Sequence, residues 1–389
     1  MNGYSNIETK KLPKGWKLDF LDTVTIRGTG HTPDKKHPEY YNGSVKWVSL
    51  ADSDKLDKVY IDSTAIEISD KGIENSSAVL HPAGTVILSR DAGVGKSAIL
   101  KTPMAVSQHY ITWQCKGEID NHYLYYVLQY LKPEFERIAV GSTIKTIGMP
   151  YFRKLKILLP PLAEQKKIGQ MLLNYDQVLF QLEKLSNEKL LLKKGLMQEL
   201  LTGKKRLKGF KGKWKETTLG DILNYEQPGK YIVKSTEYNN LFDIAVLTAN
   251  KTFILGYTDE RDSVFTDVPV IIFDDFTTLS KYVDFPFKVK SSALKILKAN
   301  SSSFNLRYVF EAIQLIEHSP GGHKRYWISE YQQIKIKHPP LNEQREIAII
   351  GEIIENEIAA LASQLEYYEQ QKKGLMQQLL TGKKRVKAK

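Results

Sequence analysis

The sequence predicts an α/β (α+β) protein with an internal pseudo-two-fold repeat, in which two mixed α/β globules are separated by two long antiparallel coiled-coil helices. The first reason is that one segment occurs twice. It opens as PPLAEQKKI at Pro160 and as PPLNEQREI at Pro339, and it closes as KKGLMQELLTGKKRLK at Lys208 and as KKGLMQQLLTGKKRVK at Lys387. Both ends are offset by 179 residues (339 − 160 and 387 − 208), so the two copies have equal length.

The second reason is the periodicity of this segment, which is that of a long helix packed against another. Apolar residues recur at spacings of three and four, although Ser186, Lys189 and Lys193 interrupt the pattern in the first copy. Pro-Pro and an early glutamate precede each run, and lysines with Thr-Gly follow it. A run of about 40 residues gives a helix roughly 60 Å long. Gly195 and Gly374 interrupt the helices, and a close helix crossing would explain them.

The helix pair and its partner are expected to share an apolar interface. Antiparallel pairing of two equal helices would place Leu182 opposite Leu361 near the midpoint. The expected interface residues are Tyr175, Leu179, Leu182, Leu196, Leu200, Ile354, Ile358, Leu361, Leu365, Leu375 and Leu379.

The third reason is that the stretches outside the helices begin alike. The opening around Trp16 returns around Trp214, at an offset of 198 residues (214 − 16). The chain is therefore predicted to contain a first globule at 1–159, a long helix at 160–206, a second globule at 207–338 and a C-terminal long helix at 339–389. Apolar runs predict the elements within each globule. The first has strands at 45–50, 86–89 and 104–113, a helix at 124–130 and a loop at 141–143; the second has strands at 244–247, 268–273 and 287–297 and a helix at 306–316.

Composition narrows the class of protein. The 389 residues are 42% hydrophobic, enough for sizeable cores, and a net charge of +12 indicates an anionic partner, nucleic acid before membrane. Cys115 is the only cysteine, which excludes a disulfide framework and a cysteine-based metal site. Because the sequence shows neither a signal-peptide pattern nor an apolar run of membrane-spanning length, we expect a cytoplasmic protein with no membrane partner.

One loop suggests nucleotide chemistry but fits it poorly. Residues 90–97 follow a predicted strand and end in Gly-Lys-Ser, like a phosphate-binding loop, yet Arg90 stands where that motif requires glycine. Arg90 and Lys96 therefore suit contact with DNA better. The sequence shows no metal-ligand spacing and no nucleophile elbow. Asp274 and Asp275 could accept hydrogen bonds from cytosine amino groups at a loop edge. These patterns indicate a binding protein rather than an enzyme.

Basic residues cluster where the helices end. Residues 189–215 contain ten Lys or Arg against one Glu, and residues 372–389 contain seven and no acid. Such runs either cap and solvate the helix ends or contact DNA phosphates, which supply most of the non-specific affinity for DNA.

Taken together, these residues resemble the DNA-specificity subunit of type I restriction–modification enzymes. The resemblance covers nearly the whole chain. It rests on the Gly-Trp-Lys opening, the Thr-Pro to Trp-Val run at 32–48, the two Pro-Pro-Leu-x-Glu-Gln helix starts and the two Gly-Leu-Met-Gln-x-Leu-Leu-Thr-Gly endings. Residues 225–233 and 270–278 are similar to a recurring type of recognition domain.

The resemblance implies two target recognition domains, each reading one half of an interrupted DNA sequence in the major groove, with the helices setting the spacer. It also implies the partners: double-stranded DNA, two modification subunits that dock on the helices, and restriction subunits. S-adenosylmethionine, ATP and Mg²⁺ would be bound by those partners. This chain would then hold no cofactor, no metal and no catalytic residue.

Polar and basic residues of loops are the expected DNA contacts, since Gln and Arg bond adenine and guanine edges bidentately. In the first domain they are His31, Lys35, Lys36, Arg90, Lys96, Gln108, His109, Ser142, Thr143 and Lys145. In the second they are Gln227, Lys230, Tyr231, Asp274, Asp275, Thr277, Thr278, Lys281, His323, Lys324 and Arg325. Trp47 and Tyr41 are expected in the core. Two other classes remain open: a coiled-coil scaffold with no DNA role, and a nucleotide-dependent enzyme built on the Gly-Lys-Ser loop.

Overall fold

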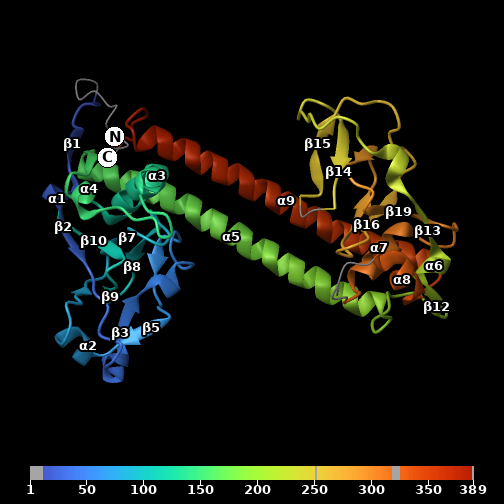
Figure 1. Ribbon diagram of the computed structural model, residues 1–389, viewed down its shortest axis with the longest axis horizontal. Helices are drawn as coiled ribbons and strands as arrows, with labels where there is room; N and C mark the ends of the chain where they lie inside the picture. Colours follow the sequence, from blue (N-terminus) through green and yellow to red (C-terminus); the bar gives the residue numbers. More distant parts are fainter. Residues whose placement is uncertain (1–11, 250–251, 318–324, 388–389) are drawn as a thin grey trace. The chain divides into compact units, whose positions relative to one another are not determined.

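The structure is a computed structural model and describes residues 12–249, 252–317 and 325–387 (Figure 1). The chain divides into two compact units, residues 1–184 with 363–389 (unit 1) and residues 185–362 (unit 2). Each unit contains one globule and part of both long helices, α5 (Leu162–Leu201) and α9 (Leu341–Leu379). Sheets and helices are mixed in both units, which confirms the α+β fold class.

The globule of unit 1 contains two sheets. The larger has the order β2 (Thr25–Thr29), β10 (Tyr110–Cys115), β7 (Val86–Ser89), β8 (Ser97–Leu100), β4 (Tyr60–Ile61), and only β4 and β8 are parallel among these pairs. The smaller has the order β5 (Ile66–Ile68), β3 (Tyr41–Val48), β9 (Met104–Val106), β6 (Leu80–His81), with β3 parallel to β9. A separate ribbon pairs β1 (Lys17–Phe20) with β11 (Lys156–Leu159). The helices are α1 (Leu21–Val24), α2 (Asp70–Glu74), α3 (Asn121–Ile138), which lies against β7 and β8, and α4 (Met149–Arg153).

The globule of unit 2 is a smaller version of the same plan. Its main sheet has the order β13 (Leu223–Glu226), β19 (Leu294–Ala299), β16 (Val270–Asp274), β17 (Ser280–Val283). A second sheet has the order β15 (Ile254–Thr258), β14 (Ile244–Leu247), β18 (Phe287–Val289), with β14 parallel to β18. A ribbon pairs β12 (Lys215–Thr218) with β20 (Lys335–His338). The helices are α6 (Leu219–Ile222), α7 (Leu306–Gln314) and α8 (Tyr326–Ser329).

The two globules share one strand order. The arrangement β2–β10–β7–β8 in unit 1 corresponds to β13–β19–β16–β17 in unit 2, and each globule adds one parallel pair, β3 with β9 or β14 with β18. A capped helix follows in each case, since the side chains of Asp120 and Asn305 accept from the first turns of α3 and α7. The predicted internal repeat therefore extends from the helices to the topology of the globules.

Two strands predicted as continuous are each broken into two. Residues 104–113 form β9 and β10, which belong to different sheets and are separated by a turn at 107–109. Residues 287–297 form β18 and β19, also in different sheets. Apolar residues on both sides of a turn that changes sheets look like one run in the sequence, because both strands are buried.

The ends of the long helices belong to the globule cores. In unit 1, Ile168 of α5 and Leu379 of α9 are buried with residues of α3 and the larger sheet. In unit 2, Ile347 of α9 and Leu200 of α5 take the equivalent places, each 179 residues away (347 − 168 and 379 − 200). Leu200 and Leu379, expected at the helix pair, therefore pack into the globules. The other predicted interface residues are buried or half-buried: Tyr175, Leu179, Leu182, Leu196, Ile354, Ile358, Leu361, Leu365 and Leu375.

The repeated motifs meet each other inside each unit. Buried Glu164 accepts hydrogen bonds from Arg385 Nε (3.0 Å) and Nη2 (2.8 Å) in unit 1. Buried Glu343 accepts from Arg206 Nε (2.7 Å) and Nη2 (2.6 Å) in unit 2. The two pairs are related by the 179-residue offset, so the same bidentate contact occurs once in each unit. It joins the segment that follows the end of one long helix to the start of the other.

The glutamine that follows each of these glutamates joins the helix start to the globule. Gln165 accepts from the backbone N–H of Asp120 (3.0 Å), and Gln344 accepts from that of Asn305 (2.9 Å). Each glutamine also donates to the carbonyl of the first proline of its motif, Pro160 (2.8 Å) or Pro339 (2.9 Å). The repeated Glu-Gln therefore has a structural role, because it attaches the start of each long helix to its globule.

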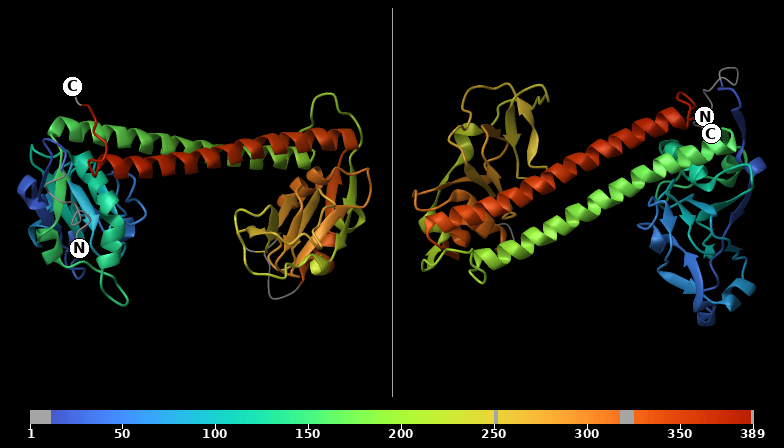
Figure 2. Two further views of the ribbon diagram at one scale, coloured as in Figure 1. Left: turned by 90° about the horizontal axis from the view of Figure 1, so that it is seen from above. Right: turned by 180° about the vertical axis from the view of Figure 1, so that it is seen from behind.

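Lysines that interrupt the apolar pattern form ion pairs between the helices. In unit 2, Lys189 pairs with Glu357 (2.6 Å) and Lys193 pairs with Glu355 (3.0 Å). In unit 1, Lys372 pairs with Asp176 (2.5 Å), and Lys372 and Asp176 are the repeat equivalents of Lys193 and Glu355. Within each unit the two helices run side by side (Figure 2). Several cations of the basic runs are thus used inside the protein.

The two helix glycines do not mark a close crossing. A Cβ atom built on Gly195 or Gly374 would meet no atom of the described residues within 4 Å. The predicted crossing is therefore wrong, and both positions face open space. A glycine inside a helix costs about 1 kcal/mol relative to alanine, and no contact among the described residues accounts for that cost here. Within the same described ranges, no helix combines the length and apolar character needed to cross a membrane.

Candidate nucleic-acid interface

Four loops of unit 1 meet at one surface. The backbone N–H of Arg90 donates to the carbonyl of His109 (3.0 Å), and that of Ile147 donates to the carbonyl of Arg90 (2.9 Å). The hydroxyl of Thr32 donates to the amide oxygen of Gln108 (2.5 Å). The loops at 31–36, 90–91, 107–109 and 140–147, which are far apart in the sequence, are therefore neighbours.

Most side chains predicted to contact DNA in unit 1 are exposed at these loops. His31, Lys35, Lys36, Gln108, Ser142, Thr143 and Lys145 are exposed, whereas Arg90 and His109 are half-buried. Asp91, which the sequence did not single out, lies 2.7 Å from Nδ1 of His109 and orients the ring. No motif spacing signals this pair, because it forms only when two strands and a turn are in place. Nε of Arg90 is buried and has no hydrogen-bond partner in the described part of the chain.

The side chain of Lys96 is held by the protein itself. Its ammonium donates to the carbonyl (2.9 Å) and the hydroxyl (3.1 Å) of Ser53. Ser97 begins strand β8, antiparallel to β7, so the Gly-Lys-Ser loop joins two strands. A phosphate-binding loop leads into a helix whose N-terminus holds the phosphate. The nucleotide-binding alternative therefore lacks its structural context.

The adjacent aspartates of unit 2 shape a turn after β16. Asp274 is 4% exposed, and its carboxylate accepts from the N–H of Phe276 (3.0 Å) and from the hydroxyl of Thr277. Asp275 is 1% exposed and accepts from the N–H of Trp327 (2.8 Å), with Lys295 Nζ 3.5 Å away. Both carboxylates lie inside the protein, as expected for acids that fix a turn, although Oδ2 of Asp275 accepts no hydrogen bond from the described residues.

The tip of this turn presents other side chains. Thr277 and Lys281 are exposed, and Thr278 is half-buried with a positive φ of 63°. Phe276 and Leu279 are 41% and 57% exposed, and the sequence did not single them out. Arg325 is exposed at the start of α8, whose first N–H, that of Tyr326, donates to the carbonyl of Asp275. His323 and Lys324 lie outside the described residues.

A second group in unit 2 surrounds Glu226. Its carboxylate accepts from Tyr231 (2.8 Å) and pairs with Lys230 (2.9 Å) and Lys298 (3.0 Å). The bond from Lys230 is the largest influence, and with the other two it lowers the pKa of Glu226 to about 2. Gln227 and Lys230 are exposed and Tyr231 is half-buried. The structure thus divides the predicted contacts of unit 2 into two groups.

Comparison with known proteins identifies the family. A family model described as the type I restriction modification DNA specificity domain matches residues 13–192 and 211–366. The chain is 44% identical over 177 residues to the EcoR124I/EcoR124II specificity subunit of Escherichia coli, over 43% of this chain and 43% of that protein, so the match spans less than half of that relative. It is 29% identical over 424 residues to the putative MjaX specificity subunit of Methanocaldococcus jannaschii, over 99% and 97% of the two chains.

A solved structure has the same fold. The S subunit of the type I restriction–modification system from M. genitalium gives a TM-score of 0.67 at 16% identity, over 98% of this chain and 99% of that chain. The TM-score supports the duplicated α+β architecture, and the family model covers most of the sequence in two blocks. The protein described here therefore belongs to the type I restriction–modification DNA specificity family.

Proposed function

We propose that this chain is the specificity subunit of a type I restriction–modification enzyme and that each globule reads one half of an interrupted double-stranded DNA target. The observation that carries the proposal is the duplicated fold, in which one strand order presents two unrelated sets of loops. Base edges specify sequence, while phosphate contacts fix the register. Two unlike loop sets on one scaffold therefore suit two unlike half-sites.

Unit 1 would read its half-site through the four loops that meet around Arg90. Gln108 presents amide N–H donors outward, because Thr32 already occupies its amide oxygen. His109 is oriented by Asp91 and presents its other ring nitrogen. The exposed Lys35 and its basic neighbours would neutralise phosphates, which gives salt-dependent affinity without sequence preference.

Unit 2 would read the other half-site through the turn after β16. Thr277, Thr278 and Lys281 are the polar candidates at its tip. Asp274 and Asp275 would act as positioning residues, because their carboxylates hold the turn and the start of α8 rather than face solvent. The group around Glu226, with Gln227 and Lys230, is a second candidate contact.

The helices would dock two copies of a modification subunit, and two equivalent hollows support this. In unit 1 a hollow of about 530 Å³ lies between α3 and five α9 residues, Glu369, Lys372, Lys373, Met376 and Gln377. In unit 2 a hollow of about 380 Å³ lies beside α7 and five α5 residues, Leu190, Lys193, Lys194, Met197 and Gln198. The five positions obey the 179-residue offset, and four of the five residues are identical, with Leu190 in place of Glu369 as the exception. A surface that occurs twice on the chain is suited to bind two copies of one partner.

The open glycines and the exposed apolar residues of the helices also support docking of a partner. Gly195 and Gly374 lie beside these hollows, and their open space would admit a close-packed partner. Leu190, Leu191 and Leu192 are 56%, 70% and 52% exposed on α5. Successive side chains of a helix point about 100° apart, and of these three Leu190 lines the hollow of unit 2. S-adenosylmethionine, ATP and Mg²⁺ would be held by the partner subunits, with this chain contributing no catalytic group.

Mapping of methylated adenines tests the proposal. DNA from cells that express this chain with its modification subunit should carry methyl groups at one bipartite sequence, and cells with either protein alone should not. Replacement of Thr277, Thr278 and Lys281 with alanine should relax only one half of that sequence. The same modification by the partner alone, or a change in both halves, would contradict the proposal.

A further inference from the structure

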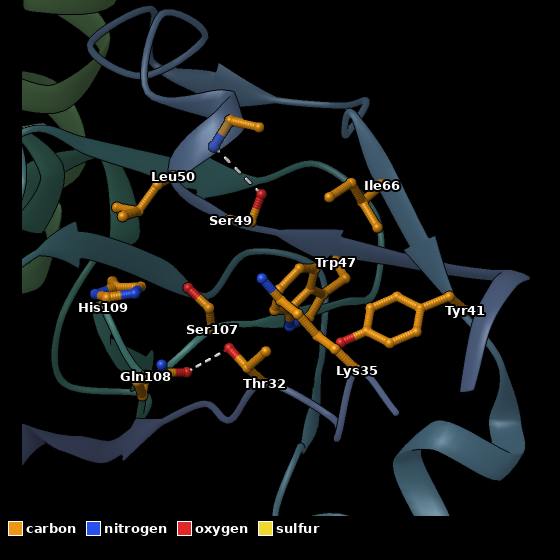
Figure 3. A pocket seen from close by; sticks show the side chains of 11 residues that line it. Thr32, Lys35, Tyr41, Trp47, Ser49, Leu50, Ile66, Ser107, Gln108 and His109 are labelled. Carbon is orange, nitrogen blue, oxygen red and sulfur yellow. Dashed lines mark hydrogen bonds between the residues drawn. The ribbon is translucent and has the colours of Figure 1, made fainter. Parts of the chain in front are cut away.

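A hollow of about 610 Å³ opens among the loops of unit 1 that are proposed to face DNA (Figure 3). Tyr41, Trp47 and Ile66 lie along one side, and Leu50, Ser107 and His109 lie along the other. Sites for small molecules and cofactors occupy roughly 300–1,000 Å³ and combine apolar walls with a few polar groups. This hollow has that size and that combination of apolar and polar residues.

The apolar side is rigid because its polar atoms are already satisfied. Nε1 of Trp47 donates to the carbonyl of His31 (3.1 Å), and the hydroxyl of Tyr41 donates to the carbonyl of Pro33 (2.6 Å). The two rings meet edge to face, with centroids 6.4 Å apart. Trp47 is 4% exposed, as expected for a core residue, so Tyr41 and the 37%-exposed Ile66 supply most of the accessible apolar wall.

The polar side offers groups that the protein does not use. Ser107 is 1% exposed and lines the hollow, and its hydroxyl has no hydrogen-bond partner among residues 12–249, 252–317 and 325–387. Gln108 has its amide oxygen held by Thr32, which directs the amide N–H groups away from that bond. A buried polar group without a partner is unfavourable, so an unpartnered hydroxyl in a preformed hollow indicates a ligand.

We propose that this hollow binds a DNA base displaced from the stack of the first half-site, an inference that rests on the proposed function. A stacked base pair offers the protein only its edges and cannot cover the ring of Tyr41. A displaced base offers a planar face to the apolar wall and a polar edge to Ser107 and Gln108. Enzymes that modify a base extrude it from the duplex, which leaves the opposite base without a partner. The exposed Lys35 at the rim would hold the adjoining phosphate.

Mismatch scanning of the DNA tests the proposal in the assembled complex of this chain and its modification subunit. Duplexes carry the target mapped from methylated adenines, with one mismatch at a time stepped through the first half-site. A mismatch opposite the displaced base removes the cost of unpairing and should tighten binding roughly 10- to 100-fold at one position. Removal of that base itself, as an abasic site, should reverse the gain.

Two matched variants assign the effect to the hollow. Ala51→Trp fills it from an exposed position of the lining, and Ala83→Trp places the same side chain at an exposed position elsewhere in unit 1. The tightening should disappear in Ala51→Trp and persist in Ala83→Trp, and Ser107→Ala should reduce it several-fold.

Each of the following outcomes would contradict the inference. If the complex binds its target specifically but no mismatch in the first half-site tightens binding, or if Ala51→Trp keeps the effect, the hollow does not take a base. If Ala51→Trp loses the modification subunit while Ala83→Trp retains it, the hollow holds a partner side chain instead. If the wild-type complex shows no sequence preference at all, the proposed function itself fails.

Discussion

Tyr126 should hold α3 of unit 1 to the long helices through one hydrogen bond. It is fully buried, and its hydroxyl donates to the carboxylate of Asp176 (2.6 Å), which also pairs with Lys372 (2.5 Å). Burial, and then the charge of Asp176, hold the pKa of Tyr126 far above its ordinary value, so the hydroxyl stays a donor. Tyr126→Phe keeps the ring and removes this bond. A hydrogen bond to a charged group contributes about 1.5–3 kcal/mol, and unit 1 should lose that much stability.

Amide hydrogen exchange of the intact chain measures this loss locally, which avoids treating a two-unit protein as a single two-state system. The expected change corresponds to exchange roughly 10- to 150-fold faster in the peptides of α3. Tyr367→Phe is the matched control, because Tyr367 is 58% exposed on α9 and lies in the same unit. That variant should stay within about 0.5 kcal/mol of wild type.

A double-mutant cycle with Asp176→Ala separates the hydrogen bond from packing. In the Asp176→Ala background, Tyr126→Phe should be nearly neutral, because the acceptor is already gone. Equal exchange rates in Tyr126→Phe and Tyr367→Phe, or the same cost of Tyr126→Phe in both backgrounds, would refute the assigned role of the bond.

Three further predictions concern DNA reading, spacing and acid stability. Arg90→Ala should weaken recognition of the first half-site, or weaken binding to every sequence and lower its salt dependence if Arg90 contacts a phosphate; unchanged binding in a gel-shift titration would remove it from the interface. One heptad inserted after Leu182 and one after Leu361 should lengthen each helix by roughly 10 Å while keeping the apolar pattern in phase. The mapped half-sites should then lie about three base pairs further apart; an assembled variant with the original spacer would show that the helices do not set the spacer length. Burial raises the pKa of Glu164, but hydrogen bonds led by that from Arg385 outweigh it and lower the pKa below the ordinary 4.5. The stability from this pair is therefore full above pH 4.5 and lost as pH falls through the lowered pKa, so the melting temperatures of wild type and Glu164→Gln should converge in acid; a constant gap would contradict this.

The long helices could be predicted because periodicity and duplication are properties of the chain itself. Their contacts were only partly visible. In the sequence, Glu164 recurs as Glu343 and Arg206 recurs as Arg385. The repeat does not show that each glutamate contacts the arginine of the other copy. Which arginine each glutamate contacts depends on how the two helices align, residue by residue, when they pair antiparallel. Gly195 illustrates the converse error, since a residue that looked like a crossing point faces open space.

The exposure of the candidate DNA contacts was predicted less well, because residue type does not determine exposure. Asp275 and Gln108 both looked like base readers, yet Asp275 is buried against Trp327 while Gln108 is exposed. Ser107 carried no signal, as a small residue between two apolar strands usually packs in the core. Its unpartnered hydroxyl appears only when the loops of unit 1 are assembled.

The two units differ in the order in which synthesis can complete them. Residues 185–362 form unit 2 from one continuous stretch, whereas unit 1 needs residues 363–389 as well as its N-terminal part. Domains generally fold as the ribosome releases them, N-terminal first. Here Leu379 and Arg385, which complete the core of unit 1 and the contact with Glu164, are translated only after all of unit 2. The globule that is translated first is therefore completed only after unit 2, and a ribosome that stops near residue 362 would release a finished unit 2 attached to an open unit 1.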